Sequence, residues 1–389
     1  MNRSITVGID IGTQSTRVLV GEYTKGETMP SIIGMGVAES RGMRRGYVSN
    51  KHEAGKAIVK ALEEAERTSK IKIRRAFVSV GGLSLDSVIT SGMAVVSKAD
   101  GEVTELDVKK AVEESEEALG SLPNRHILHT IPMKWKLDGK EIWGRPVGMK
   151  GLKLEVKTLF ITCLEQHLND LAEVIEEAGV EVIDVVAAPV AASLVSLTKR
   201  QKTAGCVLVN IGAETVSMVV FENDTPTFLH VFPIGGTDIT NDIALGLKIP
   251  IEEAEEIKLG NRDSQNYPRK KLDEIIEARL IDIFELVENY LKKIGRSGLL
   301  PAGIVLTGGS TQLAIVEELA RDTLDLPSKV TTPDLMQNSK GKIRNAAWAV
   351  CYGLLLLSNR LSQEEDGLVV GFFKKAKNAL HASLKELLP

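Results

Sequence analysis

The chain has 389 residues, of which 43% are hydrophobic and 26% are charged, and its formal charge is −4. At about 150 residues per domain, this length predicts roughly two to three domains. The 34 glycines and 13 prolines are too few for a disordered or collagen-like chain. The near-neutral balance of charges gives no reason to expect a nucleic-acid partner. Three scattered cysteines indicate a reducing, cytoplasmic compartment and no structural metal site.

The N-terminal segment alternates between apolar and polar residues on both sides of a turn that contains glycine. Ile5, Val7 and Ile9 precede residues 10–16, and Val18 and Val20 follow them, so we expect a β-hairpin. Farther along, the spacing predicts an amphipathic helix over Lys51–Ser69 and a strand over Ala76–Val80.

The character of the chain changes between about residues 83 and 157. A charged helix is predicted at Glu105–Leu119, and the remaining signals are isolated strands. We therefore expect a small α+β subdomain, inserted between the strand at Ala76–Val80 and a strand at Thr158–Cys163.

The hairpin pattern returns about 200 positions later. Val207–Gly212 repeats the order of apolar strand, polar residue, isoleucine and glycine seen at Ile5–Gly12, and a second strand follows at Val216–Phe221. This weak internal repeat predicts two comparable halves, although two unrelated hairpins could also coincide. The remaining predicted elements are a strand at 228–232, helices at 237–247, 251–259 and 272–294, a strand at 304–307, a helix at 312–319 and a fully buried helix at 343–357.

The first turn has the chemistry of a phosphate-binding loop. Backbone amides from Gly12 to Ser15 can face phosphate oxygens, because glycine allows close approach, and the hydroxyls of Thr13 and Ser15 can donate as well. Asp10 at the end of the strand can hold a hydrated Mg²⁺. Ordinary hairpin turns use the same residues, so this signal is weak by itself.

Two further glycine-rich turns strengthen the interpretation. Gly235-Gly236-Thr237 opens a predicted helix and offers anion-facing amides. Gly308-Gly309-Ser310 follows a buried strand and can lie flat against a nucleotide base. Three such turns in two similar halves favour a nucleotide clamped between domains.

At this point the sequence resembles a known family. Residues 8–13 (GIDIGT), 304–309 (IVLTGG) and 345–347 (NAA) resemble motifs of the actin-like ATPase superfamily. Residues 235–244 (GGTDITNDIA) together with 254–258 (AEEIK) are similar to the FtsA family of bacterial cell-division proteins. The stretches at 45–48 and at 275–280, which runs on to Leu313, and the position of the insertion after Val80 add to this similarity. It covers nearly the whole chain.

The resemblance implies an α/β fold, namely a two-domain actin-like (ribonuclease H-like) fold with a small inserted α+β subdomain. The first domain would comprise residues 1–82 and 158–200, with the helix at 343–357 returning to it. The insert would comprise 83–157, the second domain 201–342, a linker 358–371, and an amphipathic membrane-targeting helix 372–389.

The resemblance also implies a site for ATP and Mg²⁺. Asp10 would organise the metal, and Glu255 and Lys258 would reach the ribose and adenine. Without the resemblance, a solvated helix face would be the preferred interpretation of these two charges. The implied nucleotide-binding residues are Asp10, Gly12, Thr13, Gln14, Ser15, Asn210, Gly212, Gly235, Gly236, Thr237, Glu255, Lys258, Gly308, Gly309 and Ser310.

One motif departs from the superfamily pattern. The second phosphate motif usually reads Asp-Ile-Gly-Gly-Gly-Thr, whereas this chain has Asn210-Ile211-Gly212-Ala213-Glu214-Thr215. Asparagine cannot supply the anionic partner of Mg²⁺ on which phosphoryl chemistry depends, and Glu214 adds a carboxylate near the phosphates. We therefore predict no catalytic residue here, with ATP bound as an assembly ligand and hydrolysed slowly or not at all.

The C-terminal segment from Phe372 to Leu388 has the pattern of a helix that lies in a membrane interface. At about 100° per residue, large apolar side chains fall on one arc and lysines lie opposite or at its edge. A helix docked on the protein's own surface would be the alternative. The predicted membrane-contacting residues are Phe372, Phe373, Lys374, Lys375, Lys377, Leu380, Leu384 and Leu387.

The similarity to the FtsA family predicts a protein that polymerises at the division site, on the cytoplasmic face of an anionic lipid membrane. It would tether the tubulin-like protein FtsZ by binding its C-terminal peptide near Lys270, Lys271 and Arg279, and recruit other division proteins through the insert. A pilus-assembly actin homologue similar to PilM, and a sugar or acetate kinase with the same nucleotide fold, are the alternatives. The altered Asn210 motif and the C-terminal segment weigh against a kinase.

Overall fold

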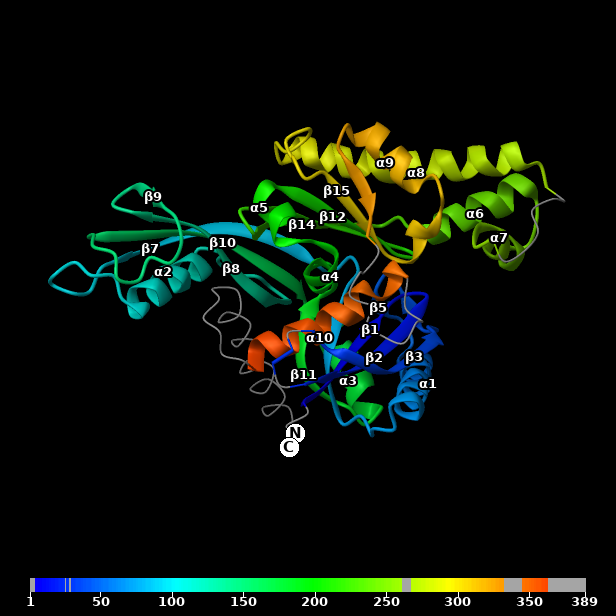
Figure 1. Ribbon diagram of the computed structural model, residues 1–389, viewed down its shortest axis with the longest axis horizontal. Helices are drawn as coiled ribbons and strands as arrows, with labels where there is room; N and C mark the ends of the chain where they lie inside the picture. The colour runs from blue at the N-terminus through cyan, green and yellow to red at the C-terminus, as the bar shows by residue number, and fades with distance from the viewer. Residues whose placement is uncertain (1–3, 25, 28, 261–266, 332–344, 363–389) are drawn as a thin grey trace.

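The computed structural model describes residues 4–24, 26–27, 29–260, 267–331 and 345–362. These residues form two five-stranded sheets, one four-stranded sheet and a two-stranded hairpin. Figure 1 shows the first five-stranded sheet and its helices at the bottom, the second at the top, and the four-stranded sheet projecting to the left. We call the two larger parts the first and the second lobe.

The two five-stranded sheets have the same topology. In each, three strands form an antiparallel meander, and two more strands add in parallel beside the first strand of that meander. This match confirms the predicted two-domain repeat. The first sheet contains β3 (Ser31–Glu39), β2 (Ser15–Tyr23), β1 (Ser4–Ile11), β6 (Arg75–Val80) and β11 (Glu181–Ala187); the second contains β14 (Thr225–Phe232), β13 (Val216–Glu222), β12 (Cys206–Ile211), β15 (Ile304–Thr307) and β16 (Ser328–Val330).

Strand β12 is apolar along its length because both of its faces are covered. Val207 and Val209 pack into the core under the helices of the second lobe, whereas Cys206 and Leu208 belong to the core shared with the first lobe. Strands buried on both faces read as continuous apolar runs, as β12 does. The helices of the second lobe are α6 (Gly236–Leu247), α7 (Ile251–Lys258), α8 (Arg269–Lys293) and α9 (Val316–Leu324), and α5 (Lys199–Ala204) precedes β12.

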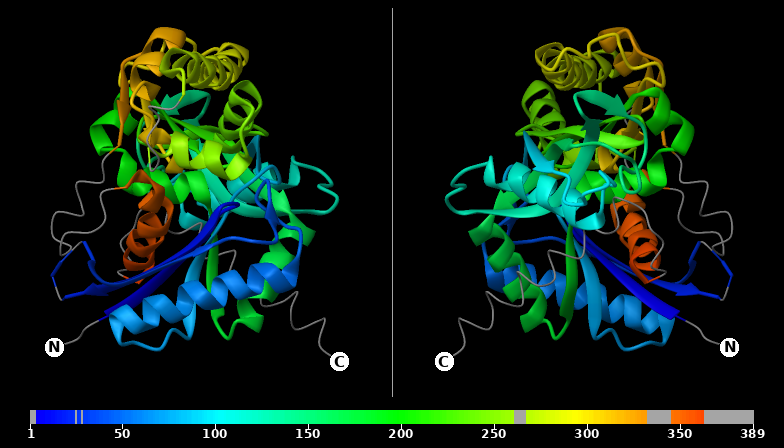
Figure 2. Two further views of the ribbon diagram at one scale, coloured as in Figure 1. Left: turned by 90° about the vertical axis from the view of Figure 1, so that its right-hand side faces the viewer. Right: turned by 90° about the vertical axis from the view of Figure 1, so that its left-hand side faces the viewer.

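The first lobe has helices on both sides of its sheet, α1 (Lys51–Ser69) on one side and α10 (Ala349–Ser362) on the other (Figure 2). Helix α1 has the predicted bounds, and Asn50 caps it by accepting a hydrogen bond from the amide of Glu53. Two further helices, α3 (Glu165–Glu177) and α4 (Ala188–Ser196), complete this lobe.

Helix α10 returns from the end of the chain to the first sheet. The Cys351 thiol lies 2.9 Å from the Gly8 carbonyl oxygen, and the Tyr352 hydroxyl donates to the Pro30 carbonyl at 3.3 Å. All residues from 346 to 357 are buried, as predicted for this helix. The α-helix itself begins later than expected, since Ala346–Trp348 forms a 3₁₀ turn that the Asn345 side chain caps.

The inserted subdomain is a four-stranded sheet with α2 (Glu105–Glu117) packed on one face. Its strands follow the order β7 (Asp86–Val95), β10 (Lys153–Leu164), β8 (Arg125–Leu137) and β9 (Lys140–Ile142). Strand β10 pairs with β7 and β8 through Thr162, so the boundary expected between residues 157 and 158 falls within one strand of the inserted sheet. The predicted strand at Thr158–Cys163 therefore belongs to the insert and not to the first sheet.

Two other predicted bounds were wrong. The helix expected at Gln312–Leu319 is α9 at Val316–Leu324, because Gly308 takes a φ of +102° and the chain forms a 3₁₀ turn at Gly309–Gln312 before turning again. The linker expected from residue 358 begins inside α10, which continues to Ser362.

The predicted membrane segment, with Phe372, Phe373, Lys374 and Leu380 among its residues, lies outside the described part of the chain. Among the described helices, none has the length and apolarity needed to cross a bilayer.

The packing of α10 on α4 leads to a stability prediction. A Cβ atom at Gly353 would lie 1.9 Å from the carbonyl oxygen of Ala191, which is backbone and cannot move aside cheaply. We expect Gly353→Ala to lower the free energy of unfolding by about 2 kcal/mol or more, measured by urea denaturation. The control is Gly55→Ala in α1, whose Cβ would meet only Val174 at 3.7 Å. That variant should gain up to about 1 kcal/mol from helix propensity, and equal stability of the two variants would contradict the prediction.

Candidate nucleotide-binding site

Two loops of the same construction face each other across a cleft between the lobes. The first loop, residues 12–15, joins β1 to β2, and the Gly12 amide donates to the Ser15 carbonyl at 3.1 Å. The second loop, residues 212–215, joins β12 to β13, and the Gly212 amide donates to the Thr215 carbonyl at 2.9 Å. The cleft is lined by Asp10, Gly12, Thr13, Gln14, Ser15, Arg17, Gly46, Asn210, Gly212, Ala213, Thr215, Gly308, Gly309, Ser310 and Ala347, among others.

Asp10 and Arg17 form the charged floor of this cleft. They lie directly opposite each other on β1 and β2, and the Ser79 hydroxyl donates to Asp10 Oδ1 at 2.6 Å. Burial raises the pKa of Asp10, which the Ser79 hydrogen bond and the Arg17 charge only partly oppose. Burial lowers the pKa of Arg17, against the attraction of Asp10.

The surroundings of Asp10 are compatible with a hydrated Mg²⁺ ion. Magnesium in nucleotide sites is usually held by one or two carboxylates, waters and substrate phosphates. Asp10 presents one carboxylate at the end of its strand, where burial disfavours the charged form even beside Arg17, so a bound cation would stabilise that charge. Arg17 adds a fixed positive charge that suits phosphate oxygens.

Gly308 is a cleft glycine whose conformation and space both exclude a side chain. Its φ is +102°, and a Cβ atom would lie 2.4 Å from Asn210 Oδ1 and 2.5 Å from the Ile211 carbonyl oxygen. The glycine thus lets the loop after β15 pack directly on the end of β12. Asn210 lies beside this glycine in the cleft lining, with an amide where the superfamily pattern has a carboxylate.

The N-terminus of α6 differs from the prediction. Gly236 and Thr237 were expected to aim their amides at an anion. These amides instead donate to the second loop, from Gly236 to the Gly212 carbonyl at 2.9 Å and from Thr237 to the Ala213 carbonyl at 2.7 Å. The amide of Gly235 donates to Asp238 Oδ2 at 2.8 Å. In this structure the helix start supports the second loop, because its donors are already satisfied.

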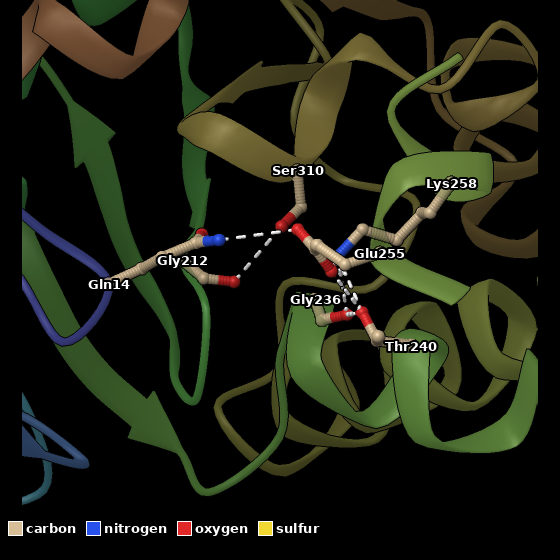
Figure 3. A network of polar contacts seen from close by, with 7 residues as sticks. All are labelled: Gln14, Gly212, Gly236, Thr240, Glu255, Lys258 and Ser310. Atoms are coloured by element: carbon tan, nitrogen blue, oxygen red, sulfur yellow. Dashed lines mark hydrogen bonds and ion pairs between the residues drawn. The ribbon is translucent and has the colours of Figure 1, made fainter. Parts of the chain in front are cut away.

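Glu255 connects the two lobes at the edge of the cleft (Figure 3). It accepts a hydrogen bond at 3.2 Å from Gln14 Nε2 in the first loop, and another from the Thr240 hydroxyl. Lys258 lies 2.6 Å from the same carboxylate and donates to the Gly236 carbonyl at 3.0 Å. Their side chains are only 24% and 7% exposed, so the solvated helix face considered as an alternative is excluded.

These contacts also favour the ionised form of Glu255. Burial alone would raise its pKa, but the hydrogen bonds from Lys258, Thr240 and Gln14 outweigh it, so the pKa is lowered. Ser310 adds a nearby contact by donating to the Gly212 carbonyl at 3.1 Å (Figure 3).

The cleft is narrow. It encloses about 120 Å³, whereas small-molecule sites typically have about 300 Å³ or more. Gln14 lines the cleft and is joined to the partly buried Glu255 by one hydrogen bond, so widening the cleft for a nucleotide would require this contact to open.

Arg17 and Gly46 are site residues that the sequence reasoning missed. Arg17 could have been found by pairing the predicted hairpin strands, because the register that closes the turn at Gly12 and Ser15 places it opposite Asp10. Gly46 reaches the cleft from a distant turn, and no local pattern indicates that.

The predicted peptide-binding cations lie on α8, away from the cleft lining. Arg279 is bound to Asp242 at 2.6 Å and lies 3.2 Å from Asp282, with 29% of its side chain exposed. Lys271 donates to the Gly246 carbonyl at 2.5 Å, and Lys270, 91% exposed, lies 3.8 Å from Glu274. The three side chains therefore differ in their partners and in their exposure, and Lys270 is the most accessible.

Solved structures of other proteins share this fold. The PilM-PilN type IV pilus biogenesis complex contains a chain with a TM-score of 0.67 and 17% identity, covering 91% of this chain and 98% of that one. MreB5 of Spiroplasma citri bound to ADP gives a TM-score of 0.52 and 14% identity, covering 93% of this chain and 99% of that one. With two matching lobes, a cleft between them and an inserted subdomain, the chain has the two-domain actin-like fold.

Sequence comparison places the chain more narrowly. Residues 207–353 match the family model described as cell division protein FtsA, and residues 82–162 match the SHS2 domain inserted in FtsA. The cell division protein FtsA of Bacillus subtilis is 32% identical, covering 95% of this chain and 87% of the relative. FtsA of Pseudomonas aeruginosa is 30% identical, covering 93% and 90%. The chain belongs to the FtsA family of cell-division proteins.

The Glu255 bridge leads to a prediction about stability and pH. Replacing Glu255 by glutamine leaves the buried Lys258 ammonium without its carboxylate, which should lower the free energy of unfolding at pH 7 by about 1–2 kcal/mol. Because the folded-state pKa lies below the ordinary value of 4.5, the contribution is fully present above pH 4.5 and is lost as pH falls through the lowered pKa. Urea unfolding at several pH values should show the two proteins converging in acid.

The matched control is Glu252→Gln, an exposed carboxylate in the first turn of the same helix. It should cost no more than about 0.5 kcal/mol, through its interaction with the helix dipole. A Glu255→Gln variant as stable as this control at pH 7 would show that the bridge does not stabilise the protein.

Proposed function

We propose that the chain binds ATP with Mg²⁺ between its two lobes and uses the nucleotide as an assembly ligand for polymers on the membrane that tether the FtsZ division ring. One observation carries this proposal: the two matching hairpin loops lie on opposite sides of a cleft whose floor holds Asp10 and Arg17. Family membership supports a role in cell division, and the cleft suggests how a nucleotide would act in it.

The polyphosphate would bind where the two loops meet. Thr13, Ser15 and Thr215 bring hydroxyl groups to the cleft, and no hydrogen bond within the described residues uses the amides of Thr13 or Gln14. Arg17 adds a guanidinium that can contact phosphate oxygens from the floor. Mg²⁺, when bound, would neutralise phosphate charge, and Asp10 would orient its water shell.

The adenosine would lie toward the second lobe. Gly308, Gly309 and Ser310 offer a surface without large side chains. Gly236 lies next to Ser310, and Lys258, which is paired with Glu255, donates to the Gly236 carbonyl. Glu255 accepts from Gln14 through Oε1, whereas Thr240 and Lys258 contact Oε2. When the Gln14 contact opens, Oε1 is therefore available to a ribose hydroxyl, and the other two contacts still hold the side chain.

Hydrolysis would be slow or absent. The position that faces the phosphates from β12 carries the amide of Asn210, and an amide can neither neutralise Mg²⁺ nor take a proton from an attacking water. Phosphate release from purified protein at ordinary ATPase rates would contradict this part of the proposal.

The acidic C-terminal peptide of FtsZ would dock at the second lobe around α8. Lys270 is exposed enough to meet a carboxylate directly, whereas Arg279 would have to exchange Asp242 or Asp282 for the peptide, or position the surface through them. The inserted subdomain would contact other division proteins.

Membrane association would come from the C-terminal segment, whose predicted apolar and lysine-bearing faces suit an anionic interface. A pilus-assembly role similar to PilM rests on structural likeness at 17% identity, while relatives at 30–32% identity are division proteins. The division role is therefore preferred.

A reconstitution experiment tests this function. The full chain is mixed with anionic liposomes, MgATP and a fluorescent FtsZ C-terminal peptide, floated on a density gradient, and viewed by negative-stain electron microscopy. We expect the protein and the peptide to float together and filaments to cover the lipid. Removing residues 372–389 should leave both in the dense fraction, because the apolar anchor is lost. The variant Arg279→Glu should float but carry about tenfold less peptide.

The control for the charge reversal is Lys292→Glu in the last turn of the same helix, which should retain the peptide. Flotation that survives the truncation would contradict the membrane anchor. Equal peptide recovery with Arg279→Glu would remove Arg279 from the docking surface, and bare lipid with MgATP would contradict the assembly role.

A further inference from the structure

One tight turn binds both the first loop (residues 12–15) and the second loop (residues 212–215). Strands β4 (Met43–Arg44) and β5 (Tyr47–Val48) form a hairpin whose turn is Arg45-Gly46. The amide of Arg45 donates to Glu214 Oε2 in the second loop at 2.5 Å. The next amide, of Gly46, donates to Thr13 Oγ1 in the first loop at 3.1 Å. Glu214 thus supplies the second lobe's half of a bridge between the loops.

This turn has little freedom to move. Arg45 and Gly46 both have positive φ angles, 50° and 87°. Gly46 packs backbone to backbone on Gly82, where a Cβ atom would lie 2.4 Å from the Gly82 Cα. The Arg45 carbonyl also accepts a hydrogen bond from the Leu83 amide at 3.3 Å. The carboxylate of Glu214 is therefore held at a defined place.

That place is beside the end of the cleft where a terminal phosphate would bind. Glu214 and Thr13 accept hydrogen bonds from adjacent amides of the same turn, and Thr13 and Gly46 both line the cleft. With the adenosine toward Gly308 and Ser310, the phosphate chain would run toward Thr13 and Gly46. A third phosphate would then come nearest to the Glu214 carboxylate.

We propose that Glu214 is a specificity-determining residue that removes the preference of the cleft for a nucleoside triphosphate over a diphosphate. This inference rests on the proposed nucleotide site. Two physical effects act in the same direction. The carboxylate repels the added charge of a third phosphate more than it repels a diphosphate, because Coulomb energy grows as distance falls. The bond to Arg45 also joins the loops without any phosphate, so a triphosphate gains less by bridging them.

Similar affinities for the two nucleotides would make the occupant of the cleft depend on their concentrations. If hydrolysis is slow and the two affinities are similar, the nucleotide bound in the cleft follows the ratio of ATP to ADP in solution. The glycine found at this position in the superfamily pattern would provide neither the charge nor the bond.

Isothermal titration calorimetry of the full chain with MgATP and MgADP tests the proposal. The wild-type protein should bind MgATP no more than about threefold more tightly than MgADP. Glu214→Gln keeps an acceptor for the Arg45 amide and removes the charge, so it should shift the affinity ratio toward MgATP by about tenfold, mainly through the Kd for MgATP. The control is Glu285→Gln, an exposed carboxylate on α8, which should leave the ratio unchanged.

The possible failures are distinguishable. A chain that binds neither nucleotide contradicts the proposed function itself. A wild-type preference for MgATP greater than about threefold, or a shift smaller than about threefold in a Glu214→Gln protein with a native circular dichroism spectrum, overturns the role of Glu214 alone. If Glu214→Gln does not fold, a wild-type preference for MgATP over MgADP greater than about threefold still overturns the proposal.

Discussion

A hydrogen bond across a four-residue turn, from Gly12 to Ser15 and again from Gly212 to Thr215, sets the geometry on which the cleft depends. Each bond closes a hairpin at the end of the first strand of its sheet. The two sheets share one strand order, and both turns line the cleft between the lobes. The charged floor, the Glu255 bridge and the Arg45-Gly46 turn are all placed relative to these loops.

Two carboxylates near this boundary, Glu255 and Asp10, have different surroundings. Glu255 is partly buried and surrounded by donors, so its charge is favoured and its pKa is lowered. Asp10 has one hydroxyl donor and one nearby guanidinium, which do not offset burial, and its pKa is raised. Because the surroundings of Asp10 disfavour its charge, a bound cation would stabilise that carboxylate most. The carboxylate of Glu255 already has its donors, and it joins the two lobes.

Local patterns predicted the hairpins, α1, the buried C-terminal helix and the repeat. Strand alternation, helix spacing and glycine turns depend only on residues that are close together in the sequence. The site was predicted in outline, because Asp10, Gly12 and Gly308 belong to such turns. The contact of Glu214 with Arg45 spans 169 positions, and the bridge from Gln14 to Glu255 spans 241, so no local signal contains them. The boundary of the insert and the start of α9 were misplaced, because β10 continues past the expected domain limit and Gly308 redirects the chain.

The central claim is that a nucleotide binds both loops at once, and amide hydrogen exchange with and without MgATP tests it most directly. We predict slower exchange in peptides that cover residues 12–15 and in those that cover 212–215, at the same nucleotide concentration, because a shared ligand protects both. Protection of one loop without the other, or of neither, would contradict the account.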